Sequence, residues 1–519
     1  MAACSGSNGA GSNPQASKAA RAAAEAKFTS ADSSLVKGVT PTALTVTTPR
    51  TINAQVPQIP LARNLSQALE VVRERTLRGA DWTNASDVTI TSQFLAVSSD
   101  VIGVEVRAAV KTGGKTTTTP TTLWYDATLS QTFSPSVLIS WPGWDAFARA
   151  VAQEATAQGL DAAKARAALQ DGAAPYGTGP AMGFGGGNTF ILSFPPAVLA
   201  PDLVQVVLDA KVVTPLLSDY GTKALGASLH PSAFTGTPST TAVWYKAPKD
   251  RPKPSSSPNL HPLPGDSTAS PDESQNPTPA SGSASSSPSP KSIPHPSTAV
   301  GIDCIVTKAV ALTFDDGPGP QTDQVIAAFT KVKGAATFFQ LGESIDQHPQ
   351  FTVLAAASGF EVGNHTLSHV DLSTVSADTA QREIAGNNAK IKKLIGRNPM
   401  LLRPPYGDHN SSVDEVAGAN NLAIINWIVD SQDWQTKNAA ATKKKIFADV
   451  AIYTGPIILL HDIQPSTVTA VPEIVDTLAQ QGYALVTVSE LTLNTGGVKT
   501  AHGYCRTTAL VQDGYLCKG

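Results

Sequence analysis

The sequence predicts an α/β protein whose C-terminal part contains a parallel sheet, either open or closed into a barrel. Three observations lead to this fold class. From about residue 305 onward, short apolar runs alternate with longer segments of helical periodicity, the pattern of strands joined by helical crossovers. A stretch rich in Pro and Ser precedes this part. Before that stretch, residues 41–246 carry their own strand and helix patterns and are expected to form a separate α+β domain.

The strands and helices of the C-terminal part are expected in alternation. Continuous apolar runs indicate strands that are buried on both faces, as in parallel sheets. The expected strands are Ala309–Phe314, Ala336–Gln340, Phe360–Gly363, Met400–Arg403, Ala423–Trp427, Pro456–Leu460 and Ala484–Val488. The expected helices are Thr322–Lys333, Ala377–Ile395, Ala439–Ile452 and Val468–Gln481.

Five polar clusters stand at or just past the carboxyl ends of these strands. Barrel active sites are built at that end, because the carboxyl ends of parallel strands meet at one rim. We therefore expect the clusters to converge although they are far apart in the sequence. They are Thr313–Pro318, His365–His369, Arg403–Gly407, Asp430–Trp434 and Leu459–Asp462.

The first two clusters contain the residues of an open catalytic metal site. His365 and His369 are separated by one helical turn, so we expect both rings on one face of a helix. Asp316 would complete a set of two histidines and one carboxylate, which suits Zn2+ and leaves Co2+ or Mn2+ open. Asp315 would then be available as a base. An ordinary turn and a solvated helix face are the alternatives, but the presence of all five clusters favours the metal site.

With these motifs in order, residues 301–495 resemble the polysaccharide deacetylase family, also called the NodB-homology domain or carbohydrate esterase family four. The resemblance implies a distorted (β/α) barrel. It also implies a metal-dependent hydrolase that removes N- or O-acetyl groups from polysaccharides.

On the base side of the site, the resemblance assigns five residues. Asp315 would be the general base, and Arg403 would orient it and keep it ionised. The metal ligands would be Asp316, His365 and His369.

On the acid side, the resemblance assigns five more. His461 would protonate the leaving group, and Asp433 would fix the tautomer of that imidazole. The backbone N–H of Tyr406 would bind the oxyanion. Trp434 and Leu459 would wall an apolar slot for the acetyl methyl group.

The segments outside the folded parts suggest an extracellular protein. Residues 247–300 are expected to be an extended linker, residues 1–40 a flexible tether, and residues 496–519 a C-terminal tail. Small residues before Cys4 are typical of a lipidated bacterial lipoprotein, although a chance cysteine is an equal alternative. Cys304, Cys505 and Cys517 leave the disulfide pairing open.

Charge and hydropathy exclude some partners. Lys and Arg total 38 against 41 Asp and Glu, which gives a net charge of −3. The sequence has no basic block of the kind that would indicate nucleic-acid binding. No apolar window of about 18 residues occurs, so we expect no membrane-spanning helix. We expect a monomer.

In residues 41–246, alternating apolar residues at 104–110 indicate a half-buried strand, and further strands are expected at Thr122–Tyr125, Thr189–Phe194 and Val204–Leu208. Trp144–Leu169 is expected to be an Ala-rich helix pair. Around Leu123–Asp126 and Pro215–Tyr220 this region resembles an RsiV-like extracellular module, which implies a binding or positioning role.

The predicted function is therefore deacetylation of a cell-envelope polysaccharide, with N-acetylglucosamine or N-acetylmuramic acid of peptidoglycan as the expected target. Chitin oligosaccharides or acetyl-xylan are alternative substrates. A non-catalytic lipoprotein that binds the wall or senses lysozyme is the alternative from another class. It needs no acid–base pair, so the intact polar clusters speak against it.

Overall fold

The computed structural model describes residues 25–48, 50–80, 86–171, 179–236, 304, 307–493 and 495–506. Cys4, Cys517 and the predicted linker lie outside these residues, and the expectations about them stay predictions. Over the described part of the chain, no helix has both the length and the apolar composition needed to cross a bilayer. Cys304 and Cys505 are both buried.

The C-terminal part contains a curled sheet in which every strand pair is parallel, as the sequence predicts for a distorted (β/α) barrel. The strand order is β15-β16-β10-β11-β12-β13-β14-β18, and β17 pairs with β10 outside this path. The strands are β10 (Ala309–Asp315), β11 (Thr337–Gln340), β12 (Glu361–Asn364), β13 (Leu401–Leu402), β14 (Ala423–Ile425), β15 (Val429–Asp430), β16 (Ile457–His461), β17 (Ala484–Leu485) and β18 (Gly503–Tyr504).

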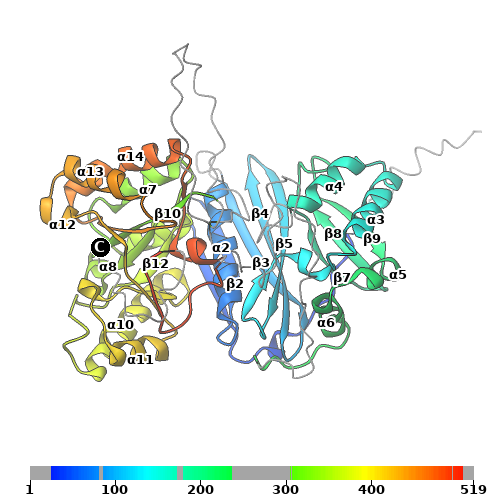
Figure 1. Ribbon diagram of the computed structural model, residues 1–519, viewed down its shortest axis with the longest axis horizontal. Helices are drawn as coiled ribbons and strands as arrows, with labels where there is room; N and C mark the ends of the chain where they lie inside the picture. The colour runs from blue at the N-terminus through cyan, green and yellow to red at the C-terminus, as the bar shows by residue number, and fades with distance from the viewer. Residues whose placement is uncertain are drawn as a thin grey trace, which may run out of the picture.

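Helices connect these strands and cover the sheet (Figure 1). They are α7 (Thr322–Lys331), α8 (Gly342–Gln347), α9 (Pro349–Ala357), α10 (Ala377–Ile395), α11 (Ser411–Ala419), α12 (Asp433–Thr436), α13 (Ala439–Asp449), α14 (Pro465–Gln480) and α15 (Val488–Leu493). A single 3₁₀ turn, Pro405–Gly407, follows β13. All seven predicted strands and all four predicted helices are present, although β13 and β17 are shorter than expected and α14 begins three residues earlier.

The predicted C-terminal tail is wrong for its first residues. Gly503 and Tyr504 form β18, which pairs with β14 at the edge of the sheet. Tyr504 is buried, and its hydroxyl accepts the N–H of Lys499 at 2.8 Å. These two residues do not stand in an apolar run, so the sequence pattern did not indicate the strand.

The N-terminal part contains a second sheet, whose strands lie in chain order. All its pairs are antiparallel except β2–β3, which α2 joins as a crossover. The elements are β1 (Thr40–Val46), β2 (Ile52–Gln58), α2 (Arg63–Gly79), β3 (Asp87–Val97), β4 (Val101–Thr112), β5 (Lys115–Asp126) and β6 (Gln131–Phe133). The strands predicted at 104–110 and Thr122–Tyr125 lie in β4 and β5.

On the face of this sheet away from the C-terminal part lie a small antiparallel sheet and further helices (Figure 1). The predicted helix pair and the two remaining predicted strands are present there. These elements are α3 (Trp144–Ala157), α4 (Ala162–Asp171), β7 (Ala181–Gly185), β8 (Thr189–Phe194), β9 (Val204–Asp209), α5 (Ala210–Val213) and α6 (Asp219–Leu229).

The prediction of a flexible tether over residues 1–40 is wrong for its last third. Phe28 packs in the core between the two N-terminal sheets, and Val36 is also buried. The N–H of Thr29 donates to the carbonyl of Phe184 at 2.8 Å. Two apolar anchors in a Ser- and Ala-rich segment offset the ordering entropy that its composition suggested would prevail.

The long helix α2 lies between the N-terminal sheet and the C-terminal part (Figure 1). One continuous apolar core contains Leu69 and Val72 of α2 together with Phe314 and Phe338 of the strands. Arg63 donates to the carbonyls of Val498 at 2.8 Å and Met400 at 2.7 Å, and also to that of Asn421. The two parts therefore share a core.

A buried charge cluster, here named the floor cluster, completes this contact. It contains four arginines and four glutamates, so its formal charges balance. Five members come from α2 and three from the C-terminal part: Glu70, Arg73, Glu74, Arg75, Arg78, Glu361, Arg397 and Glu490. Glu361 begins β12 and therefore lies at the amino ends of the parallel strands, opposite the end where the polar motifs gather.

Candidate metal and catalytic site

The site begins at the end of β10, a strand that is buried along its whole length. Asp315 is its last residue and stands opposite His461 of β16 in the parallel register. Asp316 follows with a φ of 70°, a left-handed conformation that turns the chain out of the strand. Two adjacent carboxylates are thereby presented at the carboxyl edge of the sheet, as the sequence predicts.

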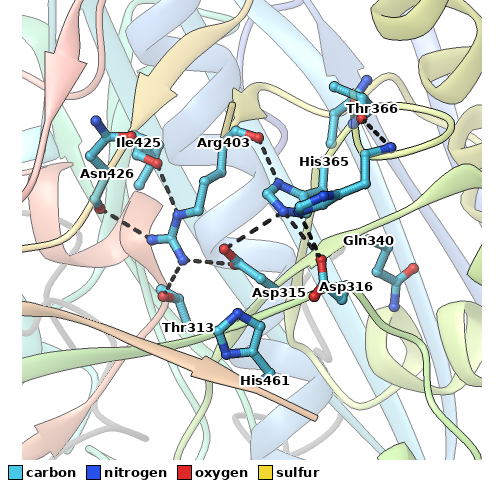
Figure 2. A network of polar contacts seen from close by, with 12 residues as sticks. Thr313, Asp315, Asp316, Gln340, His365, Thr366, Arg403, Ile425, Asn426 and His461 are labelled. Carbon is cyan, nitrogen blue, oxygen red and sulfur yellow. Dashed lines mark hydrogen bonds and ion pairs between the residues drawn. The ribbon is translucent and has the colours of Figure 1, made fainter. Parts of the chain in front are cut away.

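Asp316, His365 and His369 form a triangle whose candidate ligand atoms lie within 4.8 Å of one another. The Oδ1 of Asp316 is 3.4 Å from the Nε2 of His365 and 3.3 Å from the Nε2 of His369. Figure 2 shows Asp316 and His365 turned toward each other beside Asp315. The structure thus brings together the three residues that the sequence suggested as metal ligands.

Three observations show that this triangle suits a divalent cation. The Oδ1 of Asp316 is buried and accepts no hydrogen bond, so it has a lone pair for an ion. The Nδ1–H of His365 donates to the carbonyl of Arg403 at 2.7 Å, which leaves its Nε2 as a ligand atom. Two imidazoles and one carboxylate are also the donor types that Zn2+ takes in open sites.

The pKa shifts agree with a ligand set. Burial raises the pKa of Asp316, but the neighbouring imidazoles outweigh it and lower the pKa to about 2. Burial, together with the charge of His365, lowers the pKa of His369. These shifts favour an ionised carboxylate and a neutral imidazole, the forms that bind metal.

The prediction that His365 and His369 share a helix face is wrong. Both lie in an irregular loop after β12, in which Thr366 and His369 have φ values of 72° and 61°. The two rings still approach each other, with centroids 5.1 Å apart. The spacing predicted that the two rings meet, and they do, but a tight loop rather than a helical turn brings them together.

Arg403 anchors Asp315 from inside the sheet. Its side chain is fully buried, and its Nη1 donates to the Oδ1 of Asp315 at 2.8 Å and to Thr313 at 2.7 Å. Backbone carbonyls of residues 425 and 426 accept its remaining donors. The guanidinium also stacks over Phe339, 4.2 Å from the ring centroid. Burial lowers the pKa of Arg403, against the charge of Asp315, which raises it.

His461 and Asp433 form the second ion pair of the site. The Nδ1 of His461 is 2.9 Å from the Oδ1 of Asp433, and the backbone N–H of His461 donates to its Oδ2 at 2.8 Å. Burial lowers the pKa of His461, but Asp433 outweighs it and raises the pKa to about 9. The imidazolium form is therefore favoured at neutral pH, with Nε2 as the nitrogen that Asp433 does not hold.

The other three predicted residues also surround this edge of the sheet. The ring of Tyr406 stacks edge-on against His369 with centroids 4.8 Å apart, and its side chain is 62% exposed. The side chain of Trp434 is 48% exposed, and the backbone N–H of Trp434 donates to the Oδ1 of Asp433. Leu459 is buried in β16, two residues before His461. Their predicted roles with substrate stay proposals.

Two threonines and one carboxyl of the site were not anticipated. Thr313 braces Arg403, and the hydroxyl of Thr467 donates to Asp433 at 2.6 Å. Asp462 is buried beside Gly317, and burial raises its pKa to about 7. Thr313 and Asp462 stand inside the motif clusters, so their position was a usable signal. Thr467 stands in a helix and gave none.

Comparison with known proteins gives the site its family. A family model described as polysaccharide deacetylase matches residues 304–425. The peptidoglycan-N-acetylmuramic acid deacetylase PdaC of Bacillus subtilis is 39% identical over 185 residues, which make up 36% of this chain and 38% of that protein. The chain therefore spans well under half the length of that relative.

One further relative, and the solved part of PdaC, are covered over most of their length. A peptidoglycan-N-acetylglucosamine deacetylase of Bacillus cereus is 33% identical over 190 residues, or 36% of this chain and 88% of the relative. The solved structure of Bacillus subtilis PdaC is 36% identical and aligns with 38% of this chain and 93% of its own, with a TM-score of 0.35. With the matched segment holding the carboxylate and imidazole motifs, and a relative covered over most of its length, the chain belongs to the polysaccharide deacetylase family.

Proposed function

We propose that this protein hydrolyses the acetamide group of N-acetylated sugars in peptidoglycan with the help of one divalent ion. The observation that carries the proposal is the arrangement at the carboxyl edge of the sheet. There a carboxylate–imidazole–imidazole triangle lies beside a buried Arg403–Asp315 pair, and a His461–Asp433 pair stands on the neighbouring strand. Together these parts could supply a metal ion, a base and an acid for acyl transfer to water.

Asp316, His365 and His369 would hold the ion, with Zn2+ expected first and Co2+ or Mn2+ as alternatives. When bound there, such an ion would polarise the acetyl carbonyl and lower the pKa of a water molecule. A carboxylate with a free buried oxygen and an imidazole whose other nitrogen is already bonded support this assignment.

Asp315 would take the proton from the attacking water. Its Oδ1 is held by Arg403 at 2.8 Å, and its Oδ2 lies 3.8 Å from the Nε2 of His365. Because the Nη1 of Arg403 also donates to Thr313, the guanidinium is fixed and holds the carboxylate of Asp315 in one orientation.

His461 would return a proton from Nε2 to the sugar nitrogen as the C–N bond breaks, so that acetate and a free amine are the products. Its pKa of about 9 keeps this acid charged at neutral pH. Asp315 and His461 stand side by side on neighbouring strands, which places base and acid at the same edge. The N–H of Tyr406 would bind the oxyanion, and Trp434 and Leu459 would border the acetyl methyl group.

Peptidoglycan is the proposed substrate because the relatives described above are named for its N-acetylmuramic acid and N-acetylglucosamine residues. Chitin oligosaccharides and acetyl-xylan are the alternatives. We further propose that the protein is located in the envelope or outside the cell, with a lipid anchor at Cys4. We also propose that it is a monomer. The RsiV-like region would bind the wall or position the enzyme. A purely wall-binding lipoprotein is disfavoured because its site would not need two buried charge pairs at one sheet edge.

The test is acetate release from purified peptidoglycan, chitin oligosaccharides and acetyl-xylan, with mass spectrometry of the fragments. We expect each deacetylated sugar in the peptidoglycan fragments to be lighter by about 42 Da, because a hydrogen atom replaces the acetyl group. We also expect a chelator to abolish activity and added Zn2+ to restore it. Activity that persists after complete metal removal would refute the ion. Preference for xylan or chitin would replace the substrate but keep the reaction.

A further inference from the structure

The loop that carries both candidate imidazole ligands has an unusual backbone. Thr366 and His369 adopt left-handed φ values of 72° and 61°, although neither is glycine. Such conformations persist only where the surroundings hold them in place. The Nε2 atoms of His365 and His369 keep their distances to Asp316 only while this loop keeps its shape.

The two ends of the loop are fixed by residues of the adjoining strands and by the loop itself. The N–H of His365 donates to the carbonyl of Gln340 at 3.1 Å. The N–H of Thr366 donates to the side chain of Asn364 at 2.6 Å. The N–H of His369 donates to the hydroxyl of Thr366 at 3.2 Å. The carbonyls of Thr366 and Leu367 accept the N–H groups of Gly342 and Glu343, each at 3.0 Å, while the N–H groups of the middle of the loop are held from α10.

Glu383 of α10 holds the middle of the loop. Its Oε2 accepts the backbone N–H groups of Leu367 and Ser368, each at 3.0 Å. Its Oε1 accepts the hydroxyl of Ser368, also at 3.0 Å. One carboxylate thus binds three donors in two consecutive residues, and bonds to an ionised acceptor are about twice as strong as neutral ones.

The side chain of Leu367 packs against Gly386 of the same helix and against Gly342 of α8. A Cβ at Gly386 of α10 would lie 2.6 Å from the Cδ1 of Leu367, and a Cβ at Gly342 would lie 2.6 Å from its Cδ2. Gly386 stands one helical turn after Glu383, so both grip the loop from one helix face. Glycine inside a helix is unfavourable, but at position 386 a larger residue would collide with the side chain of Leu367.

We propose that Glu383 is a positioning residue for the divalent ion. It lies outside the ligand triangle, but it fixes the loop that sets the separation of the two imidazoles. The inference rests on the proposed function, because it requires that Asp316, His365 and His369 bind an ion. Loss of Glu383 should therefore weaken metal binding without removing any ligand.

The test is calorimetric titration of the full-length, metal-stripped protein with Zn2+ alone. Glu383→Ala should raise the Kd about 10- to 100-fold, the range for residues that orient metal ligands. Glu383→Gln should stay within about threefold of the wild type, because its amide oxygen can accept both N–H groups and its NH2 can donate to Ser368. Asp378→Asn, which removes an exposed charge from the same helix, should leave the Kd unchanged.

A folded Glu383→Ala variant whose Kd for Zn2+ lies within about threefold of the wild type would overturn the proposal and leave the proposed function intact. A wild-type protein that binds no Zn2+ would overturn both. If Glu383→Ala does not fold, Glu383→Asp decides, because it keeps the charge but shortens the reach. We expect about tenfold weaker Zn2+ binding for Glu383→Asp, and an unchanged Kd would contradict the proposal.

Discussion

Asp315 is oriented by a buried hydrogen bond of 2.8 Å from Arg403. We expect Asp315→Asn to lower kcat by about 10²- to 10⁴-fold, because an amide cannot take the proton of the attacking water. Zn2+ affinity should be retained, since Asp315 is not one of the three ligands. Acetate release and Zn2+ titration on the same preparation check both statements. Undiminished activity would remove Asp315 from the role of base.

His461 offers a pH test. The proposed reaction needs the imidazolium form of His461, which exists below its pKa and is lost as pH rises through about 9. Asp433 is a cause of the raised value, so Asp433→Asn lowers the pKa of His461. The alkaline limb of the kcat profile should therefore move to lower pH.

A second histidine–aspartate pair provides the control for that profile. The Nδ1 of His409 is 2.7 Å from the Oδ1 of Asp414, outside the acid–base machinery. Asp414→Asn should leave the alkaline limb where it is. An equal shift in both variants, or none in Asp433→Asn, would show that His461 does not limit the rate at high pH. The measurement is kcat across the pH range with saturating Zn2+.

At the scale of elements, the contact of α2 with α15 depends on buried charges. The Oε1 of Glu490 is 2.6 Å from the Nε of Arg75 and also pairs with Arg78, and these side chains are almost fully buried. Burial raises the pKa of Glu490, but the two arginines outweigh it and lower the pKa. Glu490→Ala would leave two buried guanidinium groups without their carboxylate. We expect a loss of about 3–5 kcal/mol in the free energy of unfolding, measured with urea.

The matched control is a pair in contact with solvent. Lys443 and Glu473 lie on neighbouring helices with side chains 25% and 60% exposed. Glu473→Ala should cost at most about 1 kcal/mol, because exposed pairs are screened. Equal losses in the two variants would mean that the floor cluster contributes no more than a surface pair.

How far the sequence predicts the elements depends on where their signals come from. Buried strands such as β10 and β16 are indicated by their apolar runs, and the motifs at their ends placed Asp316 and His461 at the same edge of the sheet, as the structure has them. The loop of His365 escaped prediction because its shape comes from α10, whose contacts are not visible in local spacing. β18 escaped because Gly503 and Tyr504 do not stand in an apolar run, unlike the equally short β13 and β17. β15 escaped because it follows closely on the apolar run of β14. Helix α2 was not predicted, although Leu65, Leu69 and Val72 have helical spacing.

At the scale of the whole molecule, the two parts should unfold together. One apolar core runs from α2 into the strands of the C-terminal part, and the floor cluster spans the same contact. We expect a single transition in scanning calorimetry of the full-length protein, with a calorimetric enthalpy close to the van't Hoff value. Two well-separated transitions would show that the halves are thermodynamically independent, as the separate domains of the sequence prediction would be.

The position of α2 has a practical consequence for anyone who shortens this protein. A fragment that starts at the Pro- and Ser-rich stretch would keep every motif of the family. It would, however, leave Arg397 and Glu490 without the glutamates and arginines of α2 that pair with them. It would also expose apolar side chains of the shared core to water. We expect such a fragment to aggregate in the cell, so the smallest soluble unit for expression must include the helix from Arg63 to Gly79 and the sheet behind it.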